Sequence, residues 1–427
     1  MSDYKNRGLT LNKPKITKTG LQKHLSKKKI TFIGYSEEEL NSLFFEKNYY
    51  YKLSSYKKNF EREQSGTYPH LSVLCLDKLS VLDTKLRYFL LKLSMDIEHY
   101  SKAYFLSLIS DIPSIDGYKI VDEYFIYQFK NKKIKTFLQN RKKDFVKTKI
   151  EYIQFLNKKD EEMNNLASEM FNKTLDSLDI KENIYIEKAF FTIENELISN
   201  LISKYNPEFN NSQEYMEYIN YKKSYDNPNS AANNNIIKGA EKLKLDLIKK
   251  HENNPYSNPK IIKNKYNSSI WFILDMMMFG EYIQFLSYFN LKYNKILDET
   301  DKKKIKDFLT SVSIVKDFRN ILAHNQVLLI NIKQQERNIN KISPILKKTV
   351  LKNFTKRQTN RLRNNRIHDM VLLIKLYFQW VDSSNAKYIT LLELEKIIEN
   401  AQNLPTEITD SIFFKDIIDI LKLLTIK

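Results

Sequence analysis

The segment FRNILAHNQVL, residues 318–328, brings together three side chains that could carry out chemistry, namely Arg319, Asn320 and His324. Histidine titrates near neutral pH, so it can accept a proton and return it. Arginine is a permanent cation whose planar guanidinium binds phosphate. The pair could therefore cleave a phosphodiester. It could equally belong to an ordinary helix with an arginine salt bridge and a solvated histidine.

A helix over 304–325 is predicted to position these side chains, because its apolar residues recur every three or four positions. Arg319 projects within this apolar stripe, and Asn320 and His324 lie one turn apart on a neighbouring face. An arginine on the apolar side needs an anion, since a lone buried charge is strongly unfavourable. The carboxylate of Glu98 and an RNA phosphate both qualify, and they are compatible. The stripe consists of Ile305, Phe308, Leu309, Val312, Val315, Phe318 and Leu322.

A second long helix is predicted over 71–109, and it carries two stripes. The polar stripe contains Glu98, our candidate partner for Arg319, which would hold the guanidinium while its outer edge reaches a substrate. Asn320 would fix the imidazole tautomer or contact the phosphate. The apolar stripe is Leu82, Leu86, Phe89, Leu93, Ile97, Tyr100 and Tyr104, and the polar stripe is Asp83, Arg87, Ser94, Glu98 and Lys102.

The whole chain is predicted to be all-α. Its 427 residues include only 7 glycines and 9 prolines, which leaves few places for tight turns. A short strand or hairpin is expected, at most, in the middle. Ser36 and Glu39 form a capping-box pattern at a helix start. Further helices are expected near 268–290, 301–325, 369–382, 388–402 and 410–424.

Four segments are predicted along the chain. The first is an N-terminal helical module over 1–70. Residues 71–110 form the first part of the core, 111–260 a long and mostly helical insertion, and 261–427 the second part of the core with the Arg–His motif and C-terminal helices.

The net charge of +19, from 70 Lys and Arg against 51 Asp and Glu, indicates a polyanionic partner, with nucleic acid favoured over a membrane surface. Lysine-rich solvation is the competing interpretation. The run at 129–149 mixes cations with phenylalanines, as RNA-binding surfaces do, but it also fits a helix with its phenylalanines in the core. The cations predicted here to contact RNA are Lys132, Lys133, Arg141 and Lys142.

A second arginine-to-histidine spacing occurs in RNNRIH, residues 363–368. Its neighbours are polar and basic throughout, so we expect nothing there to bury the pair. The stretch 356–366 is interpreted as facing nucleic acid or as simply solvated. Its predicted RNA contacts are Arg357, Arg361, Arg363 and Arg366.

Other chemistries have little support. The single cysteine, Cys75, excludes an internal disulfide and a cysteine-rich zinc site, and is expected to be buried. The six histidines show no metal-ligand spacing, and no phosphate-binding glycine loop is present, so neither metal nor cofactor is expected. The most apolar window, 270–280, is too short to span a bilayer and contains Asp275. The basic start lacks the apolar region of a signal peptide. We expect a cytoplasmic protein with no membrane partner.

Four segments in order resemble the Abi-like (AbiD/AbiF) family of bacterial abortive-infection proteins. Besides RNILAHN they are NYYYKLSSYKKNF (48–60), LDKLSVLDTKLRYFLLKLSMDIEHYSKAYF (76–105) and WFILDMMMFGEYIQFLSYF (271–289). The segment 76–105 resembles the family's Asp-x-x-Leu-Arg helix with its later Ile-Glu pair, and Asp83, Arg87 and Glu98 fall on those positions. The resemblance therefore implies that these three are supporting residues of the site. The chain departs from the pattern at Asp275, where a glutamate is expected, and at Lys102, where an arginine is usual.

The resemblance implies a HEPN-type helical bundle that cuts RNA without metal, with Arg319, Asn320 and His324 as its catalytic residues at a homodimer interface. It also implies antiphage defence by RNA damage and growth arrest, as a toxin, in some related systems together with a small non-coding RNA. The alternative is a non-catalytic RNA-binding protein that forms a ribonucleoprotein assembly with such an RNA. A DNA-binding regulator is a third possibility, and it rests on positive charge alone.

Overall fold

The computed structural model describes residues 18–47, 50–129, 132, 231–252, 267–333 and 342–425. The chain divides into two compact units. The first unit combines Met1–Ser101 with Thr310–Lys427, and the second unit is Lys102–Leu309. Every named element in the described residues is a helix, which confirms the all-α prediction, and one isolated β-bridge joins Thr31 to Ser72. No described helix is long and apolar enough to cross a membrane.

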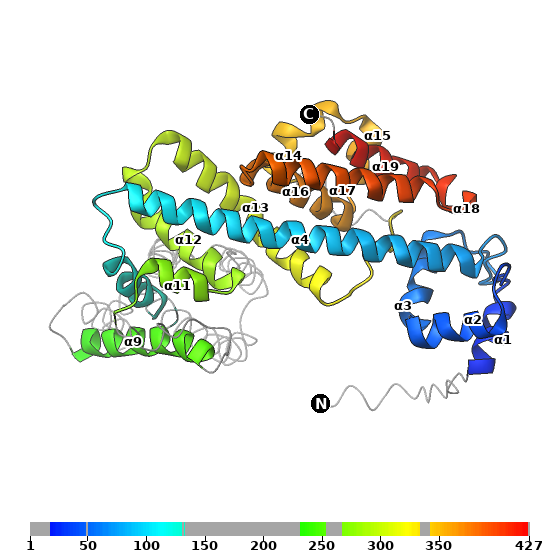
Figure 1. Cartoon of the computed structure of the whole chain (residues 1–427), viewed down its shortest axis with the longest axis horizontal. Coiled ribbons are helices and arrows are strands. Elements are labelled where there is room, and N and C mark those ends of the chain that lie inside the picture. Colours follow the sequence, from blue (N-terminus) through cyan, green and yellow to red (C-terminus); the bar gives the residue numbers. More distant parts are fainter. Residues whose placement is uncertain are drawn as a thin grey trace, which may run out of the picture. The chain divides into compact units, whose positions relative to one another are not determined.

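The first unit begins with a module of short helices, drawn in blue in Figure 1. Its elements are α1 (Lys18–Lys27), α2 (Glu37–Ser42), the π-helix η1 (Leu43–Lys47), α3 (Tyr50–Ser55) and the 3₁₀-helix η2 (Tyr56–Asn59). The predicted capping box is present, because Ser36 Oγ accepts from the Glu39 amide and the Glu39 carboxylate accepts from the Ser36 amide. This pair satisfies two backbone donors that the start of a helix otherwise leaves without partners.

The long helix α4 (Val73–Asp111) follows. In the first unit both of its predicted stripes face inward: Leu82, Leu86 and Leu93 are buried, and so are Asp83 and Arg87. The polar stripe is therefore not a solvated face. Cys75 is fully buried, as predicted, and receives a hydrogen bond from Ser72.

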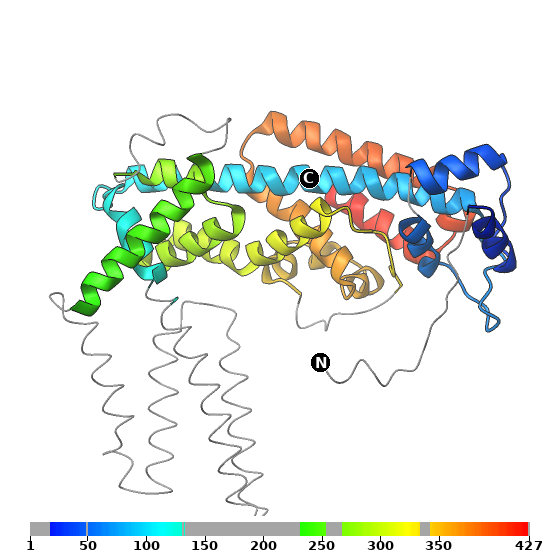
Figure 2. The same ribbon diagram turned by 90° about the horizontal axis from the view of Figure 1, so that it is seen from below.

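The C-terminal part of the first unit packs further helices around α4. They are α14 (Pro344–Thr349), η7 (Leu351–Asn353), α15 (Lys356–Arg361), α16 (Asn365–Trp380), α17 (Ser384–Gln402), α18 (Thr406–Thr409) and α19 (Ile412–Thr425). Figures 1 and 2 both show α17 running alongside α4. Two contacts join these helices: Lys92 pairs with Glu393 at 2.8 Å, and Lys85 donates to Asn400 at 3.2 Å. The three predicted C-terminal helices are confirmed as α16, α17 and α19.

The second unit contains the end of α4, a helix over 119–129, α9 (Ala231–Glu252), α11 (Ile270–Met276), α12 (Phe279–Tyr293), η5 (Asn294–Ile296) and the start of α13 (Glu299–Ala323). Aromatic edges meet in its core, where Phe105 contacts Tyr282 and Phe289. Such edge-to-face contacts add to the stabilisation that burial of the rings provides.

The helix predicted near 268–290 is wrong in one respect, because the chain breaks at Met277 and Met278, which adopt extended backbone angles. Side chains of other segments bond the carbonyls there: Lys102 donates to the Met277 carbonyl at 2.8 Å, and His251 Nε2 lies 3.0 Å from that of Met276. Apolar periodicity continues through the break, so the sequence pattern does not reveal it.

Candidate active site

Arg319 lies near the C-terminal end of α13 and is held by α4. Its Nη1 donates to Glu98 Oε2 at 2.7 Å, so the expected pairing of these two residues is present. Both side chains are partly accessible, at 29% for Arg319 and 15% for Glu98. Arg319 therefore sits at the border of the apolar stripe, which is buried at Phe318 and Leu322. The carboxylate fixes the guanidinium at a position that solvent can reach.

Asn320 is exposed near the end of α13, and His324 is exposed directly after Ala323, the last residue of the helix. The helix ends here in a Schellman motif, in which the amide of Gln326 bonds the Ile321 carbonyl and the amide of Asn325 bonds the Leu322 carbonyl. Asn325 adopts the left-handed conformation that this motif requires, with φ of 55°. His324 is therefore the last residue before the chain turns away from the helix.

Buried polar side chains hold the segment that follows the motif. Asp83 Oδ1 accepts the amides of Leu328 at 2.8 Å and Leu329 at 2.6 Å. Asn59 donates to the Leu329 carbonyl at 2.7 Å and accepts the amide of Ile332 at 3.2 Å. Because buried backbone groups without partners are costly, these contacts fix the segment in one conformation.

The same segment is held on its other side by the region of α16. Asn364 caps the start of this helix and donates to the carbonyl of Asn331 at 3.0 Å. Arg366 donates to the carbonyl of Val327. The motif of Arg319 to His324 and the segment after it thus bond three separate parts of the first unit: the N-terminal module, α4 and α16.

Lys52, a lysine of α3, bonds the residue that directly follows His324. It is 5% exposed, and its Nζ donates to Asn325 Oδ1 at 2.8 Å. Burial lowers the pKa of Lys52, the charge of Arg87 lowers it further, and that of Asp83 opposes the shift. Burial likewise raises the pKa of Asp83, against the two amides that it accepts. Lys52, Asp83 and Arg87 therefore form a buried charged cluster beside the motif.

Sequence reasoning missed Lys52, Asn59 and Asn325. Lys52 and Asn59 lie within the tyrosine-rich segment 48–60, whose resemblance to the family was noted as a signature without roles for single residues. An available signal was Asn325 itself, since asparagine directly after a helical pattern favours a left-handed helix end. Asp83 and Arg87 are predicted supporting residues. Asp83 accepts two amides of the segment that follows His324, and Arg87 lies close enough to Lys52 for its charge to lower the pKa of that lysine.

The expectation that nothing would bury the pair of Arg363 and His368 is wrong at His368. His368 is fully buried; its Nε2 accepts the amide of Ser343 at 3.1 Å and its Nδ1 lies 2.8 Å from Asp369. Arg361 and Arg357 both pair with Asp416, a fully buried carboxylate on α19, at 2.7 and 2.6 Å. Two arginines of the stretch 356–366 therefore pair with a carboxylate more than fifty residues away, a partner that the local sequence does not indicate.

Of the other predicted RNA contacts, Arg363 is partly buried, Arg366 is engaged with Val327, and Lys132 is exposed. Lys133, Arg141 and Lys142 lie outside the described residues, as does most of the run 129–149. Their binding of RNA stays a prediction.

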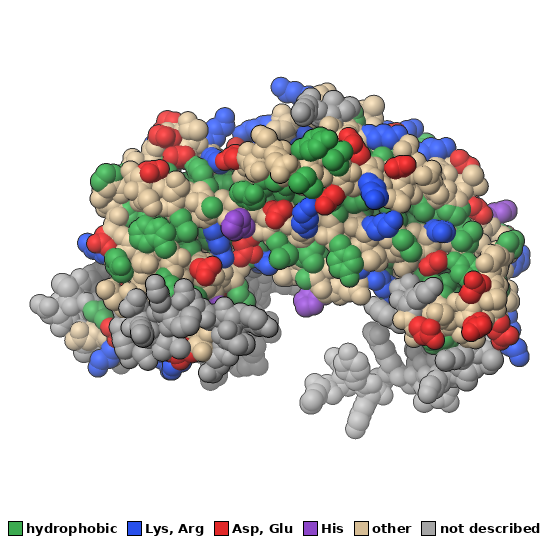
Figure 3. Space-filling model, viewed as in Figure 1, with side chains coloured by type: hydrophobic (Ala, Val, Ile, Leu, Met, Phe, Trp, Pro, Cys, Tyr) green, Lys and Arg blue, Asp and Glu red, His purple; other side chains and the backbone are tan. Residues whose placement is uncertain are grey.

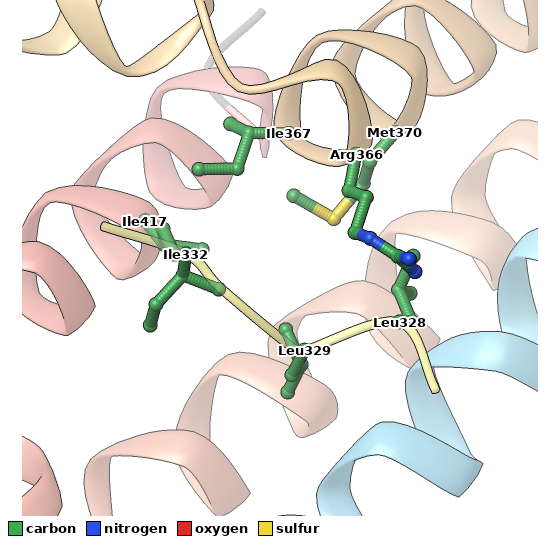
Figure 4. A pocket seen from close by; sticks show the side chains of 7 residues that line it. All are labelled: Leu328, Leu329, Ile332, Arg366, Ile367, Met370 and Ile417. Carbon is green, nitrogen blue, oxygen red and sulfur yellow. The ribbon is translucent and has the colours of Figure 1, made fainter. Parts of the chain in front are cut away.

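A small apolar hollow lies between the segment after the motif, α16 and α19 (Figure 4). Arg366 contributes its one charged side chain, and that guanidinium is committed to the Val327 carbonyl. The hollow offers no group for chemistry. Its lining residues are Leu328, Leu329, Ile332, Arg366, Ile367, Met370 and Ile417.

The strength of the bond between Glu98 and Arg319 can be measured as a coupling energy. In a double-mutant cycle with Glu98→Gln and Arg319→Met, we expect the pair to contribute about 1 to 2 kcal/mol to the free energy of unfolding, because both groups are largely shielded from water. The Lys92–Glu393 pair, exposed by 43% on both sides, is the matched control on the same helix and should give at most about 0.5 kcal/mol. Equal couplings for the two pairs would contradict this expectation.

Comparison with known proteins places the chain in a family. Residues 43–177 and 170–330 match the sequence model of a family described as Abi-like protein. Because these regions together span more than half of the chain, the protein belongs to the Abi-like family. Membership indicates a role in abortive-infection defence. No curated protein and no solved structure matches the chain.

Proposed function

We propose that the protein is a metal-independent endoribonuclease with a HEPN-type helical core, acting in antiphage abortive infection. The observation that carries the proposal is the arrangement at the end of α13. There Arg319 is fixed by Glu98 at a partly accessible position, and Asn320 and His324 are exposed within the next five residues. The excess of positive charge over the chain supports a polyanionic substrate.

In this mechanism the ribose 2′-oxygen attacks the adjacent phosphorus, and the bond from phosphorus to the 5′-oxygen breaks. His324 acts as general acid or base, on the 2′-OH or on the leaving oxygen. Arg319 stabilises the negative charge that develops on the phosphoryl oxygens. Glu98 positions Arg319, and Asn320 orients the imidazole or the phosphate. The products are a 2′,3′-cyclic phosphate and a 5′-hydroxyl.

The proposed enzyme is a homodimer through the motif face. Arg319 and His324 are five residues apart, so on one helix their side chains point about 140° apart. Arg319 of one copy and His324 of a second copy can therefore reach one phosphate more easily than the two residues of a single copy. This geometry supports a site formed by two copies of the chain.

The proposal is tested by incubating the purified full-length protein with RNA in EDTA. We expect cleavage to persist with the metal removed, and to be abolished in Arg319→Ala. Cleavage that requires a divalent metal, or that survives Arg319→Ala unchanged, would overturn the assignment.

A second function, RNA binding without turnover in a ribonucleoprotein with a small non-coding RNA, is supported by a cluster of cations in the N-terminal module. Burial and the charges of Lys28 and Arg62 lower the pKa of Lys57 to about 8. Burial, followed by Lys28, Lys57 and Lys27, lowers the pKa of His24. Cations close enough to disfavour one another's charge form a favourable place for a polyanion. On the face drawn in Figure 3, Lys and Arg are interspersed with Asp and Glu.

Salt dependence of RNA binding tests the N-terminal cation cluster, which consists of His24, Lys27, Lys28, Lys57 and Arg62. If Lys28 and Arg62 bind phosphates, Lys28→Glu with Arg62→Glu should weaken binding of single-stranded RNA. The plot of log K against log salt should then flatten by about 0.7 for each phosphate that is no longer bound. The matched control is Lys303→Glu with Lys306→Glu, two exposed lysines on α13. An unchanged slope in a folded cluster variant would show that the cluster does not touch RNA.

The two functions are separated by His324. If His324→Ala leaves both phage protection and toxicity intact, while the variants of the N-terminal cation cluster no longer bind RNA, the binding function is the correct one. If His324→Ala abolishes toxicity while the variant still binds RNA, the nuclease function is the correct one.

A further inference from the structure

Lys52 is a lysine of α3 within the tyrosine-rich segment 48–60. Its Nζ donates to Asn325 Oδ1 at 2.8 Å, across 273 positions of sequence. Asn325 directly follows His324. The bond therefore joins the N-terminal module to the residue adjacent to the proposed general acid or base.

Asn325 determines how α13 ends. Its left-handed backbone and the two Schellman hydrogen bonds set the direction in which the chain leaves the helix. A residue other than glycine is uncommon in this conformation, and asparagine tolerates it best. Lys52 holds this turn through its hydrogen bond to the side chain of Asn325.

Packing alone does not account for a lysine at position 52. The side chain is 5% exposed and lies near Arg87, another buried cation, with Asp83 as the nearby carboxylate. Removing an ammonium from water is strongly unfavourable, and a well-packed apolar side chain of similar volume is often at least as stabilising. The charged donor is thus explained by what it reaches, which is the carbonyl oxygen of the Asn325 side chain.

Asp83 holds the chain a few residues after the same turn. The amides that it accepts, those of Leu328 and Leu329, begin three residues beyond Asn325. Lys52 and Asp83 thus fix the chain at two successive points after His324. With both in place, the last turn of α13 has little freedom to unwind.

We propose that Lys52 is a positioning residue for His324, acting through Asn325 to hold the C-terminal turn of α13 in the conformation that cleavage requires. This inference rests on the proposed nuclease function. It assigns to α3 a part in the active site, although α3 contributes no group that touches the RNA.

The test compares Lys52→Met with Lys244→Met in the full-length protein. Lys244 is a lysine of α9 that is also buried, at 6% exposed, and is paired with Asp122, so it controls for the removal of a buried ammonium elsewhere in the chain. We expect Lys52→Met to lower kcat by about 10- to 100-fold through misplacement of His324. KM should stay within about twofold, because the residues that contact RNA are unchanged. Lys244→Met should retain the wild-type kcat.

A second readout does not depend on cleavage. In protein labelled at its six histidines, the His324 ring signal in the NMR spectrum, assigned with His324→Gln, should shift and broaden in Lys52→Met and not in Lys244→Met. Should Lys52→Met fail to fold, Asn325→Gly keeps the left-handed turn, removes only the acceptor, and should give the same changes.

The role of Lys52 is overturned if kcat and the His324 signal are both unchanged in folded Lys52→Met or Asn325→Gly. It is also overturned if Lys244→Met changes them equally. If the wild-type protein does not cleave RNA, the proposed function fails by itself. The His324 signal then still decides whether Lys52 positions that residue.

Discussion

His324→Ala is expected to reduce RNA cleavage by about 10²- to 10⁴-fold, the range that a general acid or base contributes. RNA affinity should change little, because Arg319 and the other cations remain. The expected signature is a fall in kcat with KM preserved, measured with a fluorescent RNA at several substrate concentrations.

His70→Ala is the matched control for this prediction, since His70 is an exposed histidine in the loop that precedes α4. It should cleave at the wild-type rate. Wild-type cleavage by His324→Ala would remove His324 from the mechanism and leave Arg319 as a phosphate-binding residue only.

Asp83→Ala is expected to give the largest decrease in stability, about 3 to 5 kcal/mol in the free energy of unfolding measured with urea. The carboxylate is fully buried and accepts the amides of Leu328 and Leu329. Its removal leaves two buried donors without an acceptor, and Lys52 and Arg87 without their nearby anion. The effect should appear in the segment after the motif, whose amides should exchange faster with solvent.

Asp83→Asn should be less destabilising, because the amide oxygen can still accept from the two backbone donors while the negative charge is gone. Asp111→Ala, at the exposed end of the same helix, is the control and should change the stability by less than about 0.5 kcal/mol. A decrease below about 1 kcal/mol for Asp83→Ala would show that the segment after the motif does not depend on this carboxylate.

Local patterns predicted the helices well where one side of a helix is apolar. The stripe on α13 and the apolar stripe on α4 in the first unit are buried as expected, at residues such as Phe308, Val312, Leu86 and Leu93. The ion pair of Glu98 with Arg319 was also predictable, because a guanidinium at the edge of a buried stripe needs a carboxylate and α4 presents one at a polar position.

The features that sequence could not predict depend on contacts between distant segments. Arg361 pairs with Asp416, and Lys52 reaches Asn325 across most of the chain. In both cases the local pattern placed a cation in water or left it without a role, since nothing within a helical turn indicated its partner. The break between α11 and α12 has the same origin, because Lys102 and His251 bond the carbonyls that the broken helix exposes.

The most direct test of the central claim is the chemistry of the RNA ends after cleavage by the purified protein in EDTA. Mass spectrometry of the fragments should show 2′,3′-cyclic phosphate and 5′-hydroxyl termini, because the proposed nucleophile is the ribose 2′-oxygen and no metal-bound water takes part. An RNA with a 2′-deoxy sugar at the cleaved position should stay intact. Fragments with 5′-phosphate and 3′-hydroxyl ends, or cleavage at the deoxy position, would contradict the proposed mechanism.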